Sequence, residues 1–442
     1  MLKFDIQNRR YVGNKFKLKN WLQENILSNT KGNIFFDVFS GTGVISQIFS
    51  KNYNKIIIND FLYSNNIIYK AFFEQVPFNE EKLITIIESF NKIQTSNLKD
   101  NYFNLMFANK FFGMNDSKKI GYIREDIEKK YNNKEINSKE RALLVTSLLY
   151  AMDKIANTCG HYDAYRKNGI YNKHLEMTFP EINVKCNNNN MCYNRDTNIL
   201  INDIEADLVY IDPPYNSRQY CDAYHLLENV AKWEKPKVFG VAKKMDRTNL
   251  KSEYCTQRAT KTFEELINNI KARYILLSYN NMEKKGDSRS NAKISDEDII
   301  RILKKKGNVK IFSEKHKAFN AGKSNIEGNE ERLFLCECFK AEKKIIPSAI
   351  NYTGGKYKLL PQIMKYFPNN VDNVVDLFCG GCNVGINLSS NKVVFNDKNE
   401  HLIGLFNAFK RLDEKYIFDT IFDNIKKYDL SLVAEHGYKF YG

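Results

Sequence analysis

The sequence lacks a long apolar segment and a signal-peptide pattern. No apolar run approaches the roughly 18 residues that a membrane-spanning helix needs, and residues 1–5 show none of the features of a secretion signal. The nine cysteines are odd in number and irregularly spaced. We therefore expect a cytoplasmic protein with reduced cysteines, without disulfides and without membrane contact.

Motifs for metals and phosphates are missing as well. Cys379 and Cys382 form a Cys-x-x-Cys pair, but it lies in a glycine-rich turn and no second pair matches it, so we expect no metal site. The loop over residues 40–43 has neither the Gly-Lys-Ser/Thr of a phosphate-binding loop nor the three glycines of a dinucleotide-binding loop. These absences argue against ATP and NAD as ligands.

The chain contains enough hydrophobic residues for ordinary cores and has an excess of positive charge. Its 442 residues suffice for about two or three domains, and 43% of them are hydrophobic. The 67 lysines and arginines outnumber the 52 acids and give a net charge of +15. A polyanionic partner accounts for this charge. A lysine-rich composition with a solvated basic surface accounts for it too, so charge alone leaves both open.

An apolar strand over residues 33–37 leads into a loop that opens a helix at Val44. The loop contains Phe39, Ser40, Gly41 and Gly43. A strand, a glycine loop and a helix in this order are typical of the first nucleotide-binding turn of a doubly wound fold. Asp37, at the end of the strand, would repel a pyrophosphate but suits an ammonium group. S-adenosylmethionine carries an ammonium and a sulfonium but no phosphate, so the loop favours a methyl donor.

Three further positions are candidates for the same ligand. The turn Tyr11-Val12-Gly13-Asn14-Lys15 can admit an anionic group, although taken alone it fits a simple helix start better. Asp60 ends a second strand, and it either accepts hydrogen bonds from ribose hydroxyls or caps the next helix. Asp196 either accepts from the amino group of the cofactor's adenine or caps a short helix.

The stretch from Leu208 to Tyr215 is the strongest single signal. An unbroken apolar run, typical of a buried parallel strand, ends in Asp212, Pro213, Pro214 and Tyr215. Two prolines cannot continue a hydrogen-bonded strand, so the chain must leave the sheet at Asp212. A carboxylate, a stiff turn and an aromatic ring then meet at the carboxyl end of a strand, where ligands bind in open α/β sheets.

Strands and helical patterns alternate along the chain, which predicts an α/β fold. Further strands are expected at 274–280 and 331–339. Residues 61–180 are mostly helical and rich in Lys, Arg, Tyr and Asn. This composition suits a target-recognition insert that contacts phosphates and bases, or an ordinary helical subdomain with a solvated face. The charged stretch 279–292 is expected to be a surface loop.

The motifs then recur in the same order at a nearly constant offset of about 340 residues, which indicates a duplicated module rather than a repeat array. The corresponding pairs are Tyr11–Lys15 with Tyr352–Lys356, Asp37–Thr42 with Asp376–Gly381, and Asp60 with Asp397. We predict a module over 1–340, a linker over 341–348 and a partial second copy over 349–442. Because the second copy reaches Gly442 before another Asp-Pro-Pro-Tyr, we expect it to be the first third of a module.

In order and spacing, these motifs resemble the Dam-like, D12-class adenine-specific DNA methyltransferases. The tandem layout is similar to the two-module methyltransferases of type IIS restriction systems, with the second module truncated. The resemblance implies a Rossmann-like, S-adenosylmethionine-dependent methyltransferase fold, that is, a doubly wound mixed sheet with a mainly helical target-recognition insert. It also implies methyl transfer to N6 of adenine in a specific duplex DNA site, with a restriction endonuclease as a genetic rather than a physical partner.

The resemblance further implies roles for individual residues. The catalytic residues would be Asp212, Pro213, Pro214 and Tyr215. The cofactor-binding residues would be Tyr11, Gly13, Lys15, Asp37, Phe39, Ser40, Gly41, Gly43, Asp60 and Asp196. Among these, Lys15 and Asp37 would lie at the methionine end, Asp60 at the ribose and Asp196 at the cofactor's adenine. Two alternatives stay open: an RNA or other exocyclic-amine methyltransferase, and a non-catalytic DNA-recognition component of a decayed tandem enzyme.

Overall fold

The computed structural model of the chain describes most of its residues. These are residues 2–9, 11, 13, 15–169, 171–182, 189–280, 293–315, 330–339, 345–350, 352–368, 371–388 and 390–430. Most of the predicted loop at 279–292 and the first part of the predicted linker at 341–348 lie outside them. The chain divides into two compact units, Met1–Lys340 and Ala341–Gly442. In the described part of the chain, no helix is long and apolar enough to cross a membrane.

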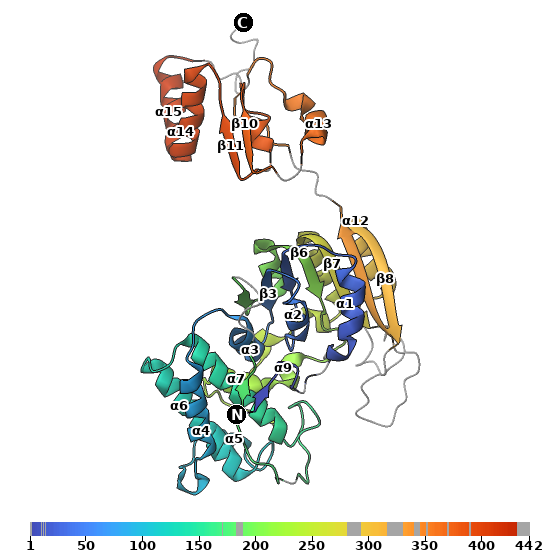
Figure 1. Cartoon of the computed structure of the whole chain (residues 1–442), viewed down its shortest axis with the longest axis vertical. Helices are drawn as coiled ribbons and strands as arrows, with labels where there is room; N and C mark the ends of the chain where they lie inside the picture. The colour runs from blue at the N-terminus through green and yellow to red at the C-terminus, as the bar shows by residue number, and fades with distance from the viewer. Residues whose placement is uncertain are drawn as a thin grey trace. The chain divides into compact units, whose positions relative to one another are not determined.

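A seven-stranded mixed sheet forms the centre of the first unit (Figure 1). Its strands, in spatial order, are β5 (Met191–Tyr193), β3 (Lys55–Asn59), β2 (Ile34–Asp37), β6 (Glu205–Ile211), β7 (Lys271–Asn280), β9 (Glu330–Cys338) and β8 (Gly307–Lys315). The strands from β5 to β7 run parallel, whereas β9 is antiparallel to both β7 and β8. The predicted mixed sheet is confirmed, and β8 is a strand that the sequence pattern did not reveal.

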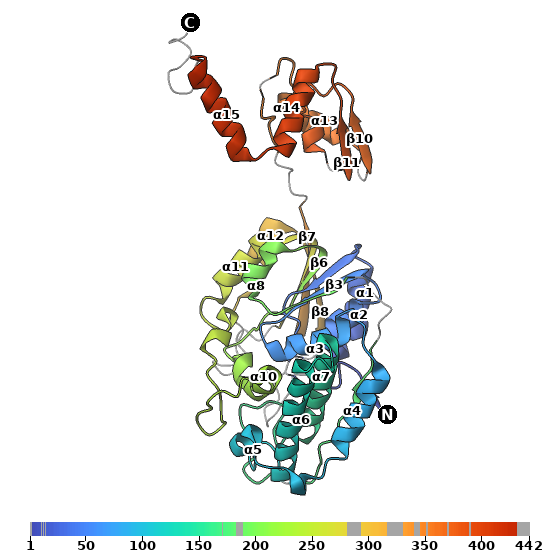
Figure 2. The same cartoon turned by 90° about the vertical axis from the view of Figure 1, so that its left-hand side faces the viewer.

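Helices cover both faces of this sheet because its central strands are apolar on both sides. In β2, Phe35 packs into one core and Phe36 into the other, and both are fully buried. The helices on the first face are α1 (Lys19–Leu27), α2 (Val44–Phe49) and α3 (Tyr63–Phe73), and those on the second are α8 (Thr197–Leu200), α11 (Ala259–Asn269) and α12 (Asp296–Lys306) (Figure 2). The doubly wound arrangement is therefore confirmed.

The segment predicted as a helical insert is built mainly from helices. They are α4 (Glu80–Asn91), α5 (Tyr102–Phe107), α6 (Met114–Asn132) and α7 (Ser138–Ile155). α3 also falls within residues 61–180, but it packs against β3 and β5 as well as against α7. It is thus the link between the sheet and the helices that follow it.

The strand order reverses between β2 and β6, which are neighbours in the sheet. From β2 the parallel strands continue to β3 on one side, and from β6 they continue to β7 on the other. Ligands of open α/β sheets bind at such a switch point, outside the carboxyl ends of the strands. The glycine loop after β2 and the Asp-Pro-Pro turn after β6 both lie there. β6 ends at Ile211, as the two prolines predicted.

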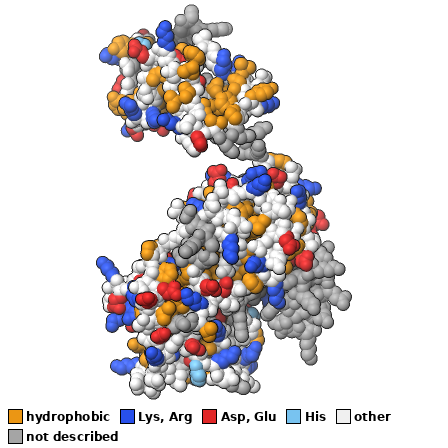
Figure 3. Space-filling view, viewed as in Figure 1, with side chains coloured by type: hydrophobic (Ala, Val, Ile, Leu, Met, Phe, Trp, Pro, Cys, Tyr) orange, Lys and Arg blue, Asp and Glu red, His pale blue; other side chains and the backbone are white. Residues whose placement is uncertain are grey.

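The second unit contains a smaller parallel pair of strands. Its elements include α13 (Leu360–Ile363), β10 (Asn373–Asp376), β11 (Lys392–Phe395), α14 (Glu400–Arg411) and α15 (Glu414–Lys427). β10 pairs with β11 as β2 pairs with β3. Among the described residues, nothing pairs with the other edge of β10. Apolar side chains are also exposed on the surface of this unit (Figure 3). Among them, Val375 is 60% exposed and Phe378 is 84% exposed.

Candidate active site

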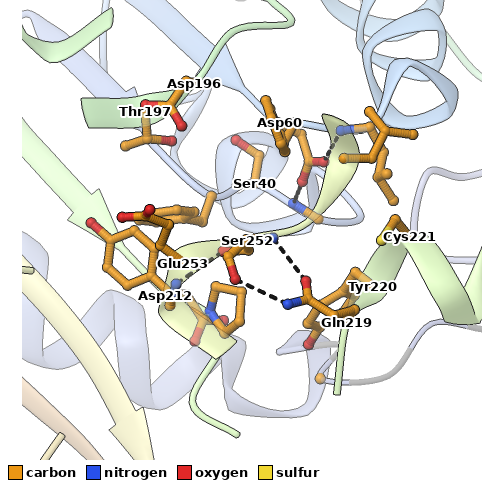
Figure 4. Close-up of a pocket in the computed structure, with 18 of the residues that line it drawn as sticks. Ser40, Asp60, Asp196, Thr197, Asp212, Gln219, Tyr220, Cys221, Ser252 and Glu253 are labelled. Carbon is orange, nitrogen blue, oxygen red and sulfur yellow. Dashed lines mark hydrogen bonds between the residues drawn. The ribbon is translucent and has the colours of Figure 1, made fainter. Parts of the chain in front are cut away.

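A pocket opens at the carboxyl ends of β2, β3 and β6, where the strand order reverses (Figure 4). Its cavity volume is about 210 Å³. The predicted site residues that line it are Tyr11, Gly13, Lys15, Phe39, Ser40, Gly41, Asp60, Asp196, Asp212 and Pro214. The predicted residues that lie outside its lining are Asp37, Gly43, Pro213 and Tyr215. The fold therefore brings the glycine loop and the Asp212 turn to one cavity.

Asp37 lies beneath the glycine loop and not on the wall of the pocket. Its side chain is fully buried, and its Oδ2 accepts a hydrogen bond from Ser46 Oγ at 2.8 Å. Its Oδ1 has no hydrogen-bond partner among the described residues. Burial raises the pKa of Asp37 to about 7, because a carboxylate is poorly solvated there. The Asp37 side chain therefore joins the end of β2 to α2, the helix that follows the loop.

Gly41 and Gly43 are needed for the shape of the loop. Their φ angles are +51° and +77°, in the left-handed region that favours glycine. A Cβ on Gly43 would come within 2.9 Å of the Ile6 side chain, and one on Gly41 within 3.2 Å of the Tyr11 ring. The two glycines thus permit a tight turn into α2 and let the aromatic ring close over it.

Asp60 faces the pocket and is held by backbone groups. Its Oδ2 accepts from Gly41 N at 3.0 Å, and its Oδ1 accepts from Leu62 N at 2.8 Å. The N-cap of α3 is Leu62, and Glu228 accepts from the first N–H groups of that helix. Asp60 is therefore not the cap of α3, which was the competing interpretation. Burial raises the pKa of Asp60 to about 6.

Asp196 caps a short helix, which was one of the two interpretations that the sequence left open. It is the N-cap of α8, because its Oδ1 accepts from Asn198 N at 2.9 Å and from Ile199 N at 3.2 Å. It also lines the pocket. Capping fixes the direction of the carboxylate, so the structural role does not remove the side chain from the site.

The Asp212 turn meets the N-terminal turn through Lys15. The Lys15 ammonium lies 3.5 Å from Asp212 Oδ1, although the two residues are far apart in the sequence. Burial raises the pKa of Asp212 to about 7, while the positive charge of Lys15 opposes this rise. Lys15 therefore neutralises only part of the negative charge that an ionised Asp212 places at the pocket wall.

Tyr11 is fixed by a stack of aromatic rings. Its ring centroid lies 4.4 Å from that of Tyr224 and 5.6 Å from that of Tyr220, with nearly parallel planes. The buried Arg9 guanidinium lies 5.1 Å from the Tyr11 ring, and Asn65 donates to the Tyr11 hydroxyl at 3.3 Å. The opening turn is therefore part of the pocket and not only the start of a helix.

Sequence reasoning missed the wall formed by residues 250–254. Gln219 and Ser252 exchange two hydrogen bonds of 3.0 and 2.8 Å, and these hold this wall against the segment that follows the Asp212 turn (Figure 4). The Tyr254 hydroxyl donates to Asn198 Oδ1 at 2.8 Å, and its ring meets Phe39 edge-on at 5.0 Å. No motif or periodic pattern marks these residues in the sequence.

The second unit repeats the hydrogen bonding of the glycine loop. Gly380 N donates to Asp397 Oδ2 at 2.9 Å, as Gly41 N donates to Asp60 Oδ2. Gly380 is also left-handed, with φ +47°, and a Cβ there would lie 3.2 Å from the Tyr352 ring. The repeated motifs thus share geometry as well as residue types.

In the described residues, no group of three or more His, Cys, Asp or Glu side chains is placed to hold a metal.

Comparison with known proteins gives two matches to one family. A model of the D12 class N6 adenine-specific DNA methyltransferases matches residues 11–290 and again residues 352–441. Type II methyltransferase M.FokI of Planomicrobium okeanokoites is 33% identical over 97% of this chain and 71% of its own length. Modification methylase StsI of Streptococcus sanguinis is 32% identical over 97% and 70%. Type II methyltransferase M.NlaIII of Neisseria lactamica is 31% identical over 61% and 83%.

The double match agrees with the repeated motifs and with the repeated loop geometry. The first match includes the glycine loop and the Asp212 turn, which share one pocket. The matching family is one of DNA methyltransferases, which is the interpretation that the sequence motifs favoured. The chain belongs to the D12 class of N6 adenine-specific DNA methyltransferases.

Proposed function

We propose that residues 1–340 transfer the methyl group of S-adenosylmethionine to N6 of adenine in a specific duplex DNA site. M.FokI is named a type II methyltransferase and StsI a modification methylase. By analogy, the role of this chain is to protect DNA in a type II restriction-modification system, in which a restriction endonuclease is a genetic partner. The observation that supports the proposal is that the glycine loop and Asp212 line the same pocket.

The chemistry of the pocket wall suits this cofactor. The lining carries five carboxylates and two lysines: Asp60, Asp196, Asp212, Glu253 and Glu265 against Lys15 and Lys251. Such a wall favours a ligand with positive charges and hydroxyl groups over one with phosphates. Asp60 would accept from the ribose hydroxyls and Asp196 from the adenine amino group. Lys15 and Asp212 mark the end at which the methionine part and the target base meet.

The mechanism requires residues of the chain to activate the target amine. When bound, S-adenosylmethionine supplies a methyl group that its positive sulfur already activates. The lone pair of adenine N6 is delocalised into the ring, so the amine must be made more nucleophilic. An Asp212 carboxylate oxygen and the Pro213 carbonyl would each accept one N–H, which draws the nitrogen toward a tetrahedral shape and stabilises its developing charge. Pro213 and Pro214 keep that carbonyl directed because their φ angles are fixed.

The target adenine must leave the duplex, because its amino group is otherwise inside the helix. Tyr215 would stack on the extruded base. Its backbone is anchored, since Lys293 N donates to Tyr215 O at 2.9 Å, and its ring packs edge-on against Tyr279 at 6.4 Å. No thiol takes part: Cys221 lines the pocket, but burial raises its pKa to about 11 and keeps it protonated.

We assign target recognition to the helical segment within residues 61–180. This segment is joined directly to the catalytic side of the pocket. Tyr162 N donates to Ala223 O at 2.7 Å, and His225 Nε2 contacts Tyr162 O at 2.9 Å. The C-terminal part of this segment is therefore hydrogen-bonded to residues 223–225, which follow the Asp212 turn in the sequence. Residues 349–442 are assigned as the N-terminal part of a second module, and 341–348 as the linker.

The test is transfer of tritium from labelled S-adenosylmethionine to unmethylated duplex DNA, followed by digestion to nucleosides. Label should appear in N6-methyladenine. Asp212→Ala should abolish transfer while cofactor binding persists, because the acceptor for the amine is removed. Asp203→Ala is the matched control, since Asp203 is an exposed acid paired with Arg195 on the surface. Transfer by Asp212→Ala at a rate near that of the unmodified chain would overturn the assignment.

A further inference from the structure

A second carboxylate, Glu331 on β9, reaches the Asp212 turn from a distant part of the chain. Its Oε1 contacts the Lys15 ammonium directly and accepts a hydrogen bond from Ser278 Oγ of β7 at 2.7 Å. The side chain of Glu331 is only 4% exposed. The same ammonium lies 3.5 Å from Asp212 Oδ1. One lysine is thus shared by two carboxylates, only one of which lines the pocket.

We propose that Glu331 is a positioning residue for the methyl transfer: it holds Lys15 in a direct ion pair and so leaves the Asp212 carboxylate available to the target amine. The inference rests on the role proposed above for Asp212 and extends it to a residue that no motif assigns. Glu331 also lies outside both segments that match the family, 11–290 and 352–441.

The geometry shows which carboxylate holds the lysine more closely. A charge-assisted hydrogen bond from an ammonium to a carboxylate is short and strong, so two carboxylates compete for the best position. Glu331 has the shorter contact, and Ser278 anchors it from the other side. If Lys15 moved onto Asp212 instead, the charge of Asp212 would be largely neutralised. Its oxygens would then be weaker acceptors for the N–H groups of adenine.

The same arrangement has a consequence for pH. After burial, the charges that act most on Asp212 are Lys15, which lowers its pKa, and Glu331, which raises it by repulsion. The other titratable groups around Asp212 are Asp37, Tyr210, Tyr215 and Tyr220. Removing the charge of Glu331 therefore lowers the pKa of Asp212 for two reasons. The repulsion between the two carboxylates is lost, and Lys15 is released toward Asp212. A substitution that changed only the packing of β9 would leave this pKa unchanged.

The experiment measures the single-turnover rate of methyl transfer to duplex DNA across a range of pH. Glu331→Gln should lower the rate above neutral pH about tenfold, the size expected for one weakened hydrogen bond to a charged group. It should also move the acid limb of the profile to lower pH. Glu331→Asp should restore part of the rate. Glu337→Gln is the matched control, because Glu337 is an exposed acid on the same strand.

A Glu331→Gln enzyme with an unchanged rate and an unchanged acid limb would overturn the inference. A lower rate accompanied by a lower melting temperature, with the acid limb unmoved, would make Glu331 purely structural and overturn it too. Asp212→Ala in the same assay distinguishes a failure of the role proposed for Asp212 from a failure of the role proposed for Glu331. If that variant is active, the role of Asp212 fails. If it is inactive while Glu331→Gln matches the unmodified chain, only the role of Glu331 fails.

Discussion

At the scale of single residues, the pocket depends on acids whose ionisation burial opposes. Burial raises the pKa of Asp37 and Asp212 to about 7 and that of Asp60 to about 6. Each acid has a different set of partners: a serine hydroxyl, an ammonium, and two backbone N–H groups. A cationic ligand would stabilise the charged forms of all three, so ligand binding and ionisation are coupled.

Asp37 allows a test of this coupling through stability. Its folded pKa of about 7 lies above the value of about 4 for an unfolded aspartate, so the folded state holds an extra proton between these values. Its contribution to stability is therefore fully present below about pH 4 and is lost as the pH rises through 7. Asp37→Asn keeps the bond to Ser46 but cannot ionise. Relative to the unmodified chain, this variant should gain up to a few kcal/mol in unfolding free energy between pH 5 and 8.

Urea unfolding of the ligand-free protein at several pH values measures this difference directly. Comparing the variant with the unmodified chain at each pH removes the contributions of Asp60 and Asp212, which both proteins share. A stability difference that does not change with pH would show that Asp37 is already ionised in the folded protein and would contradict the prediction.

At the scale of elements, buried charged side chains join the helices to one another. Glu228, on α10 (His225–Lys232), accepts from the first two N–H groups of α3 at 3.1 and 2.8 Å. Lys139 of α7 donates to three carbonyls at the other end of α3, those of Lys70, Ala71 and Glu74. The ends of a helix leave such groups without partners inside the helix. α3 is therefore held at both ends by side chains from α7 and α10.

Lys139→Met tests how much of the fold depends on this link. The three carbonyls would lose their buried donor, so the unfolding free energy should fall by about 1–3 kcal/mol. Urea denaturation should show a lower midpoint with an unchanged slope. Lys154→Met is the control, because Lys154 lies on the same helix and is exposed. Equal midpoints for the two variants would show that the capping contributes nothing measurable.

The elements that could be predicted are those whose signal is local. The end of β6 follows from two adjacent prolines, and the turn into α2 follows from Gly41 and Gly43. Glu331 could not be predicted, because its place depends on pairing between β7 and β9, in which Asn280 lies opposite Glu331. A shift of one residue in that register would turn the side chain to the other face of the sheet. The wall around Tyr254 is likewise set by tertiary contacts that no short pattern encodes.

At the scale of the whole molecule, each unit contains a glycine loop with the same hydrogen bond, but the elements around the two loops differ. In the first unit, Asp60 lines a pocket that is completed by β6 and by residues 219–221 and 250–254. In the second, Asp397 makes the same bond to a glycine N–H, and backbone hydrogen bonds lower its pKa instead of burial raising it. The described residues of the second unit contain no counterpart of β6 beside β10. The described pocket thus uses elements that have no described counterpart in the second unit.

This difference predicts that the two matched acids have unequal effects on catalysis by the chain. Asp60→Ala should raise the KM for S-adenosylmethionine about tenfold or more, because the charged acceptor proposed for the ribose hydroxyls is lost. Asp397→Ala should leave methyl transfer to duplex DNA unchanged, since the only Asp-Pro-Pro-Tyr in the sequence follows β6 of the first unit. Steady-state transfer of labelled methyl groups by the two full-length variants decides between these outcomes. A comparable loss in both would mean that the second loop contributes to the reaction, and catalysis could then no longer be assigned to residues 1–340 alone.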